Sequence, residues 1–327
     1  MLGLGIESTA HTFSCAIIEK KNNHGKILSD TRKIYRPPEG EGIHPREASR
    51  HHIENSHTVL SDCLAEAKIN ITDLDIISYA AGPGLGPCLR VGAVVARSLA
   101  SYYKIPIYPV NHAIGHIELG KLLTGAKNPL VLLVSGGHTM LLAFLDKQWR
   151  VFGETLDITL GQLLDQFGRS IGLASPCGKN IEQLAKTSSK YVLLPYSVKG
   201  NDVSFSGLLS ATKTIAKENK ANACFSLQET AFAMISEAVE RALSFTKKEE
   251  LLVVGGVAAN KRLSEMLNDV CKRHRSKFFV APLKFSGDCG SQICWTGLLE
   301  SKVKKGIPIE KTFVTQSWRL DSVVIDY

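Results

Sequence analysis

The sequence lacks the features that mark several other classes of protein. No run of its 327 residues approaches the roughly 18 consecutive apolar residues of a membrane-spanning helix, so we expect no membrane segment. Its first residues carry no basic segment and reach an acid at Glu7, which predicts a first strand and not a secretory signal. Hydrophobic residues make up 44% and charged residues 21%, which excludes a mainly disordered chain.

Paired cysteine motifs are also missing. The chain has eight cysteines, mostly among apolar neighbours and without a Cys-x-x-Cys pair. Isolated thiols of this kind are typical of reduced, buried cysteines in a cytosolic protein. We therefore expect a cytoplasmic location.

The common nucleotide-binding motifs do not occur. The chain has no Gly-x-x-x-x-Gly-Lys-Ser/Thr sequence, which argues against a P-loop enzyme. The glycines at positions 82, 84 and 86 have the wrong spacing for a dinucleotide-binding fold, and Pro83 and Pro87 remove backbone N–H donors there. A nucleotide would have to be bound by other means.

Positive charge is in excess. The net charge is +8, and the excess lies in the clusters 213–220, 272–277 and 302–305. These clusters are either solvated helix ends or contacts to a phosphate-rich partner, for which tRNA is a good candidate. For RNA contact we favour 213–220 and 272–277.

Two histidines four residues apart follow the expected strand 105–110. His112 and His116 would open a helix and share one of its faces, where two imidazoles can chelate one first-row metal ion. The spacing alone leaves a cap and a solvated residue as an alternative. A metalloprotease of the His-Glu-x-x-His type is disfavoured because Ala113 stands where its base is required.

The second half of the chain begins like the first. Residues 8–20 align with residues 135–147 at a constant offset of 127, and each segment is a polar turn leading into a strand. Similar strands and helices follow both, which favours an internal duplication into two lobes. The side chains missing at Gly136 and Gly137 would let backbone N–H groups approach phosphate oxygens, so the repeat predicts a nucleotide held between the lobes.

A second glycine turn follows the expected strand 251–254. Gly255 and Gly256 precede the expected helix 261–270, and a nucleoside can lie against backbone at such a helix start. A tight turn without a ligand is an equally good interpretation of this segment alone.

An ordered series of motifs resembles one known family, the universal tRNA threonylcarbamoyladenosine-synthesis family. This family, formerly called the glycoprotease family, supplies the catalytic subunit of the KEOPS complex in archaea and eukaryotes. The resemblance covers essentially the whole chain. The motifs are Gly5-Ile6-Glu7-Ser8, His44-Pro45-Arg46-Glu47, Gly82-Pro83-Gly84-Leu85-Gly86-Pro87-Cys88-Leu89-Arg90-Val91-Gly92, Asn111-His112-x-x-x-His116, Val134-Ser135-Gly136-Gly137-His138-Thr139, Ser204-Phe205-Ser206-Gly207-Leu208, Gly255-Gly256-Val257-Ala258-Ala259-Asn260 and Asp288.

The resemblance implies an α/β fold of the duplicated actin/hexokinase/Hsp70 type, which is ribonuclease H-like, with a nucleotide cleft between two lobes. We expect residues 1–125 plus 292–327 in the N-terminal lobe and 126–291 in the C-terminal lobe. The implied activity is that of a metal-dependent acyltransferase. It moves the threonylcarbamoyl group of threonylcarbamoyl-AMP to the adenosine that follows the anticodon in tRNAs reading ANN codons.

The resemblance also assigns roles to residues. One iron or zinc ion would be bound by His112, His116 and Asp288, which are also the catalytic residues. The residues expected to bind the AMP-type or ATP-type nucleotide are Ser135, Gly136, Gly137 and His138 at phosphate, Asp165 and Glu182 at the ribose, Gly178 beside them, and Gly255, Gly256 and Asn260 at the adenine. No general base is evident beyond Glu7 and His138, for which a role in capping a turn is equally open.

Four positions depart from the family pattern. Cys177 and Lys179 flank Gly178 where Pro-Gly-Gly-Pro is more common, and Leu209 replaces a frequent lysine. Leu133 stands where some archaeal members have a tyrosine metal ligand, so we expect only three protein ligands.

The motif at 42–47 and the residues after His116 resemble archaeal and eukaryotic members, which implies KEOPS partners, including an atypical kinase and a small dimerising subunit. A nucleotide-binding ATPase scaffold of a KEOPS-like complex is the alternative function. Such a scaffold would not need the group formed by His112, His116 and Asp288.

Overall fold

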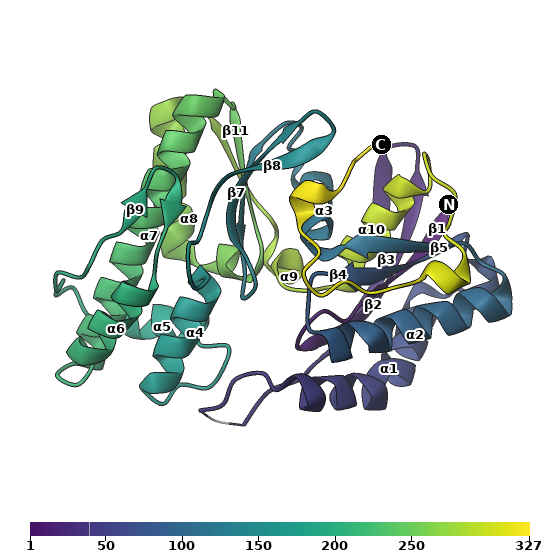
Figure 1. The fold of residues 1–327 in the computed structure, drawn as a ribbon, viewed down its shortest axis with the longest axis horizontal. Coiled ribbons are helices and arrows are strands. Elements are labelled where there is room, and N and C mark those ends of the chain that lie inside the picture. The colour runs from purple at the N-terminus through teal and green to yellow at the C-terminus, as the bar shows by residue number, and fades with distance from the viewer. Residues whose placement is uncertain (39) are drawn as a thin grey trace. The chain divides into compact units, whose positions relative to one another are not determined.

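A computed structural model describes residues 1–38 and 40–327. They form two compact units (Figure 1). Unit 1 comprises Met1–Arg36, Ile43–Leu123 and Asp288–Tyr327, and unit 2 comprises Pro37–Gly42 and Thr124–Gly287. Each unit has its own sheet and its own hydrophobic core.

The sheet of unit 1 has five strands in the order β3-β2-β1-β4-β5. The first three strands form the expected antiparallel meander, and β4 and β5 run parallel to β1. The strands are β1 (Leu2–Glu7), β2 (Thr12–Lys21), β3 (His24–Ile34), β4 (Ile76–Gly82) and β5 (Ile107–Asn111).

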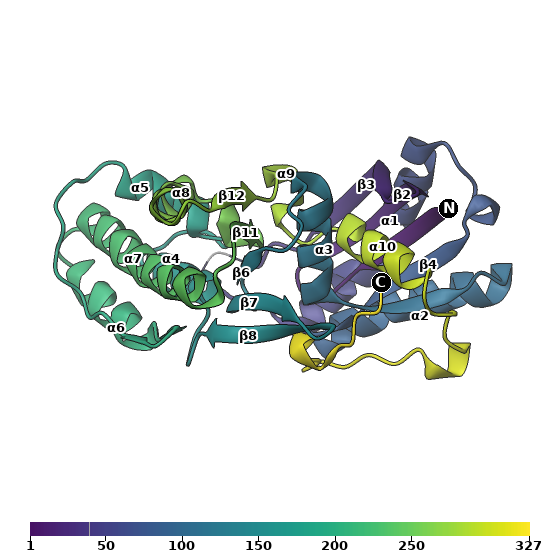
Figure 2. The same ribbon diagram turned by 90° about the horizontal axis from the view of Figure 1, so that it is seen from above.

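Helices cover both faces of this sheet. On one face, α1 and α2 pack together against a core that includes Phe13, Val59 and Tyr79. On the other face, α10 lies across β1 and β2 (Figure 2), and a Cβ at Gly5 would stand only 2.3 Å from the backbone N of Cys294. The helices of unit 1 are α1 (Pro45–Ala67), η1 (Ile71–Asp73), α2 (Gly86–Tyr103), α3 (His112–Thr124), α10 (Gly290–Glu300), η3 (Ile309–Lys311) and η4 (Leu320–Ser322).

The sheet of unit 2 repeats this topology. Its order is β12-β11-β6-β7-β8, in which β6 pairs antiparallel with β7 and parallel with β11, as β1 pairs with β2 and β4. The predicted duplication is therefore confirmed. The strands are β6 (Leu130–Val134), β7 (Thr139–Leu145), β8 (Gln148–Glu154), β11 (Glu250–Val254) and β12 (Lys277–Val280).

The segment between β8 and β11 adds helices that build the core of unit 2. The long helix α7 is buried along most of its length and packs against α5, α6 and α8. The remaining elements are α4 (Leu160–Ser170), α5 (Gly178–Ala185), β9 (Val198–Lys199), β10 (Asp202–Val203), α6 (Ser206–Ile215), α7 (Lys220–Thr246), η2 (Gly256–Ala259), α8 (Lys261–His274) and α9 (Leu283–Ser286).

The structure also describes the cysteines and the apolar character of the helices. All eight cysteines are buried and none forms a disulfide bond, as predicted. In the described part of the chain, none of the helices combines the length and the apolar character needed to cross a bilayer.

Candidate metal centre and nucleotide-binding residues

The helix α3 begins directly at His112 because the preceding residue caps it. The Oδ1 atom of Asn111, the last residue of β5, accepts hydrogen bonds from the backbone N–H groups of Ala113 (3.0 Å) and Ile114 (3.3 Å). Capping of this kind satisfies donors that a helix start leaves free. The two histidines therefore stand one turn apart, with ring centroids separated by 4.7 Å.

A carboxylate from the other end of unit 1 completes the group. The Oδ1 atom of Asp288 lies 3.5 Å from Nε2 of His112 and 3.4 Å from Nε2 of His116. Ligand atoms bound at about 2.1 Å to one tetrahedral metal ion lie about 3.4 Å apart, so these separations suit a shared ion. The predicted ligands are thus brought together, and all three ligand atoms lie within 4.8 Å of one another.

The chemistry of His116 also fits a metal. Its buried Nε2 atom faces the carboxylate of Asp288 at 3.4 Å but does not meet hydrogen-bond geometry with any described residue. An unsatisfied buried polar atom is unfavourable unless another group satisfies it. An ion held by two imidazoles and a carboxylate would do so, and this donor set suits zinc or iron.

The other nitrogen of His112 faces a buried acid. Its Nδ1 atom lies 2.8 Å from Oε2 of Glu7, whose side chain is completely buried at the end of β1. With the proton on Nδ1 donated to this carboxylate, the lone pair of Nε2 points to Asp288. A carboxylate behind a histidine fixes its tautomer and ring orientation in this way in known metal sites.

Two residues outside the predicted site hold Glu7 in place. Gln292 donates from Nε2 to Oε2 of Glu7 (3.1 Å), and the backbone N–H of Thr9 donates to Oε1 (2.6 Å). Gln292 is fully buried in the first turn of α10, four residues after Asp288. Because Asp288 precedes the helix, the spacing of the two residues gave no signal for this contact.

The electrostatics follow from this arrangement. Burial favours the neutral imidazole of His112, but the charge and hydrogen bond of Glu7, together with Asp288, raise its pKa to about 9. Burial lowers the pKa of His116 despite its contact with Asp288. A neutral His116 can donate its lone pair to a metal ion, and His112 must release the proton on Nε2 to do the same, so metal binding displaces a proton from this site.

The backbone around Asp288 is held by a second acid. Asp30 is buried and accepts hydrogen bonds from Arg32 (2.6 Å) and from the backbone N–H of Ser291 (3.1 Å). Arg32 in turn donates to the backbone O of Asp288 at 3.4 Å, and Ser14 accepts from the backbone N of Gly290. The first turn of α10 is thereby tied to β2 and β3.

The expected phosphate-binding turn lies between β6 and β7 in unit 2. The hydroxyl oxygen of Ser135 accepts hydrogen bonds from the N–H groups of Gly137 (3.2 Å) and His138 (3.0 Å). These two N–H donors are therefore already satisfied. Gly136 and Gly137 are exposed, and a Cβ added to either would have no other atom within 4 Å. The turn leaves open space beside backbone, as approach to a phosphate requires.

The second glycine turn adjoins the first. Gly255 has a φ of +97°, and a Cβ there would lie 2.3 Å from the backbone O of Val134, while Gly256 is exposed with open space. Asn260 is buried: its Oδ1 accepts from the N–H of Leu263 (3.2 Å), and its Nδ2 donates to Gln228 (3.0 Å). This side chain caps α8, so an adenine contact would compete with these bonds.

The expected ribose residues lie on neighbouring helices. Asp165 on α4 accepts hydrogen bonds from Ser175 (2.8 Å) and the N–H of Cys177 (3.2 Å). Glu182 on α5 forms an ion pair with Lys186 at 3.0 Å. Both carboxylates thus have partners within unit 2, and Gly178 begins α5 with little around it.

The departures from the family pattern have plain structural positions. Leu133 is fully buried in β6 of unit 2, and Leu209 is buried on α6. Both side chains belong to the hydrophobic interior, so the described metal group has three protein side chains.

Solved structures with the same fold have very different sequences. One is the activator of the 2-hydroxyisocaproyl-CoA dehydratase from Clostridium difficile, with 12% identity, a TM-score of 0.55, and coverage of 94% of this chain and 100% of that one. Another is HypF of T. kodakarensis, with 12% identity, a TM-score of 0.65, and coverage of 93% of this chain and 48% of that one. At such low identity they support the fold alone, which agrees with the duplicated topology.

Sequence relatives are much closer. The family model described as TsaD, tRNA N6-adenosine threonylcarbamoyltransferase, matches residues 26–295. A protein of that name from Staphylothermus marinus is 48% identical over 336 residues, covering 99% of each chain. Another from Caldivirga maquilingensis is 44% identical over 329 residues, covering 100% of this chain and 98% of the relative. The chain belongs to the tRNA N6-adenosine threonylcarbamoyltransferase family.

Proposed function

We propose that this protein transfers the threonylcarbamoyl group of threonylcarbamoyl-AMP to the adenosine that follows the anticodon in tRNAs reading ANN codons. The observation that carries the proposal is the convergence of His112, His116 and Asp288, with Glu7 behind the first histidine, in a chain of this family. An amine attacking an acyl-adenylate needs a positioned electrophile more than a strong base, and this arrangement is suited to positioning.

The metal would be one iron or zinc ion bound by the two imidazoles and the carboxylate of Asp288. Such an ion, when bound, acts as a Lewis acid that polarises a carbonyl or phosphoryl oxygen. The chain itself supplies the fixed orientation of the ligands. Glu7 sets the tautomer of His112, and Asp30 with Arg32 sets the backbone that carries Asp288.

We assign nucleotide binding to unit 2. The strongest support is the open space beside the backbone at Gly136 and Gly256. A Cβ added to either glycine would have no protein atom within 4 Å, so a ligand can approach the backbone there. Ser135 and His138 shape the first turn, and Asp165, Gly178 and Glu182 lie on the adjoining α4 and α5. For Asn260 we favour a supporting role through its cap of α8.

The two residues considered as bases differ in their surroundings. Both carboxylate oxygens of Glu7 accept hydrogen bonds, and its side chain is fully buried, so a direct proton transfer from substrate is disfavoured. His138 is partly exposed on the glycine turn. We propose that Glu7 is a positioning residue, and that His138 alone of the two can meet a substrate.

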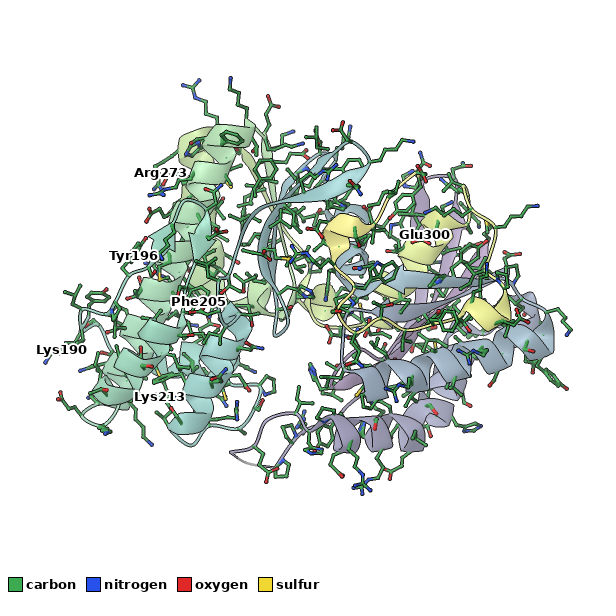
Figure 3. All side chains as sticks on the ribbon, viewed as in Figure 1. Lys190, Tyr196, Phe205, Lys213, Arg273 and Glu300 are labelled. Carbon is green, nitrogen blue, oxygen red and sulfur yellow. The ribbon has the colours of Figure 1, made fainter. Side chains whose placement is uncertain are left out.

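The partners we propose are tRNA and the subunits of a KEOPS-like complex, including an atypical kinase and a small dimerising subunit, in the cytoplasm. Free thiols throughout and relatives from archaea support this assignment. The two basic clusters favoured for RNA contact lie near opposite ends of α7, as Lys213 and Arg273 show in Figure 3. About 30 Å of helix separates Lys220 from Glu240, so a single partner that contacts both clusters must span about that distance.

A transfer assay tests the proposal. The purified protein, with and without the partner subunits, is given threonine, bicarbonate, ATP, the adenylate-forming enzyme and unmodified tRNA, and the nucleosides are analysed by mass spectrometry. We expect modified adenosine that disappears on chelation and returns with iron or zinc. Tight ATP binding without product under any partner set would instead support the ATPase scaffold, which has no use for the metal ligands.

A further inference from the structure

Lysines from two distant parts of the chain meet at one end of the sheet of unit 1. The alternate residues of β2 that face α10 include Ser14 and Lys20, and Ser14 bonds to the first residue of that helix. Lys20 lies at the opposite end of β2, beside the residues that follow α10. There Lys302 donates a hydrogen bond from Nζ to Oδ1 of Asn23, in the β2–β3 turn, at 3.0 Å.

Lys20 has an unusual environment for a lysine. Its residue is only 6% exposed, and within residues 1–38 and 40–327 its ammonium group has neither an acidic partner nor a hydrogen-bond acceptor. Lys302, which reaches the adjoining β2–β3 turn through its bond to Asn23, carries a second ammonium group near it. Burial, together with this neighbouring cation, lowers the pKa of Lys20 to about 8. Two facing cations repel each other, and an anion between them would remove that repulsion.

More lysines lie in the two segments that meet here. We define the lysine patch as Lys20, Lys21 and Lys26 of β2 and β3, with Lys302, Lys304 and Lys305 after α10. Its nearest acids compensate little: Glu19 pairs with Lys21, and burial raises the pKa of Glu300, at the end of α10 (Figure 3), to about 7. The patch therefore keeps most of its positive charge at neutral pH.

The cluster at 272–277 differs in this respect. There Lys272 pairs with Asp269 at 3.1 Å, and Arg273 lies 3.5 Å from Glu240. Local acids thus neutralise part of that charge. Charge left unneutralised is the better indication of an external anion, so the lysine patch is the stronger candidate for contact with phosphates.

The patch is remote from the metal ligands. Met1 and Lys20 exchange backbone hydrogen bonds where β1 begins, and Glu7, which bonds His112, is the last residue of the same strand. A strand of six residues spans about 20 Å. A single partner that reaches both places must therefore extend over about this distance, as a nucleic acid can.

We propose that the lysine patch binds the phosphodiester backbone of the substrate tRNA, with Lys20 and Lys302 sharing one phosphate. The proposal rests on the proposed function, because that function makes an RNA the extended partner. It adds a contact surface on unit 1, away from the metal ligands, that increases affinity for tRNA without taking part in the transfer.

The test compares two double variants that lose the same charge. Lys20→Gln with Lys302→Gln alters the patch, and Lys68→Gln with Lys104→Gln alters two exposed lysines elsewhere in unit 1. Fluorescence anisotropy gives the Kd for tRNA over a range of salt concentrations. For the patch variant we expect Kd to rise about tenfold and the salt slope to become shallower by about 0.8, since the two lysines share one phosphate and each lost phosphate contact removes roughly 0.7–0.9. The control variant should retain both values.

The transfer assay separates this inference from the proposed function. The patch variant should show a raised KM for tRNA with kcat and metal content unchanged. A wild-type protein that binds tRNA through the patch but makes no product contradicts only the proposed function. An active wild type whose patch variant keeps the same KM and salt slope overturns the inference. Two further results would also overturn the inference. Equal competition by polyglutamate would indicate that the patch binds an acidic protein. Protection of Lys20 from acylation by inorganic phosphate but not by tRNA would indicate that the patch binds free phosphate.

Discussion

Glu7 and His112 are joined by a hydrogen bond of 2.8 Å between Oε2 of the carboxylate and Nδ1 of the imidazole, although 105 residues separate them in the chain. The bond links the end of β1 to the start of α3, and Gln292 from α10 donates to the same carboxylate. Three segments that are distant in sequence therefore determine the direction in which one metal ligand points.

Replacing Glu7 with glutamine should weaken metal binding. The neutral amide makes His112 a poorer electron donor and leaves one of the present hydrogen-bond donors without an acceptor. We expect a 10- to 100-fold loss of affinity for zinc or iron, the range found when such outer partners are changed. Competition with a chromophoric chelator measures it, with the exposed Glu66→Gln as the matched control. Equal affinities of the two variants would contradict the role assigned to Glu7.

The two histidines should differ in what their loss costs the fold. His116→Ala removes a buried ring whose Nε2 faces only the carboxylate of Asp288, at 3.4 Å, so we expect lost metal and lost transfer activity at a cost of about 2 kcal/mol in unfolding free energy, the low end for truncating a buried side chain. His112→Ala also leaves the buried charge of Glu7 without its partner, which should cost about 3–5 kcal/mol.

Urea denaturation and metal analysis measure both effects on the histidines. The exposed His57→Ala is the control and should keep its metal, its activity and its stability. If His116→Ala retained a full equivalent of metal and normal transfer, the assignment of the metal ligands would be wrong.

Gly5→Ala should disturb α10 and, through it, Asp288. An added Cβ would lie 2.3 Å from the backbone O of Gly290 and the backbone N of Cys294, and neither atom can move without the helix. We expect a loss of about 3 kcal/mol in unfolding free energy, together with weaker metal binding. Gly207→Ala, on α6 with open space around it, should instead be neutral or slightly stabilising in the same urea titration. Comparable behaviour of the two variants would count against close packing of α10 on β1.

Much of this fold could be predicted from the sequence because its signals are local. The meander at the start of each unit is visible as apolar alternation between polar turns, and the offset of 127 residues aligns the turn before β2 with the turn before β7. The same holds for His112 and His116, whose spacing matches a helical turn. These features depend on neighbours within a few residues, which periodicity describes well.

The support of the site was less predictable because it comes from distant contacts. Asp30 acts on residues more than 250 positions away, and no pattern around Asp30 indicates that it holds the start of α10. Competing hydrogen bonds are a second reason. The N–H groups of Gly137 and His138 look available in the sequence, but Ser135 uses both of them, and Asn260 is occupied as a cap.

The stability of the protein should depend on pH through Glu300. Burial raises the pKa of this carboxyl to about 7 from an ordinary value of 4.5, while Lys304 opposes the shift. The folded state therefore holds a proton that the unfolded state releases, so the stabilising contribution of Glu300 is fully present below pH 4.5 and is lost as pH rises through 7.

Glu300→Gln keeps the neutral form of this side chain at every pH. We expect the variant and the wild type to be equally stable at pH 4.5 and the variant to be more stable by roughly 2 kcal/mol at pH 8. Urea titrations at a series of pH values measure the difference, and the exposed Glu310→Gln should follow the wild type throughout. A constant difference between Glu300→Gln and wild type across this range would mean that the carboxyl is ionised in the folded protein at all these pH values, and that its charge is compensated by Lys304.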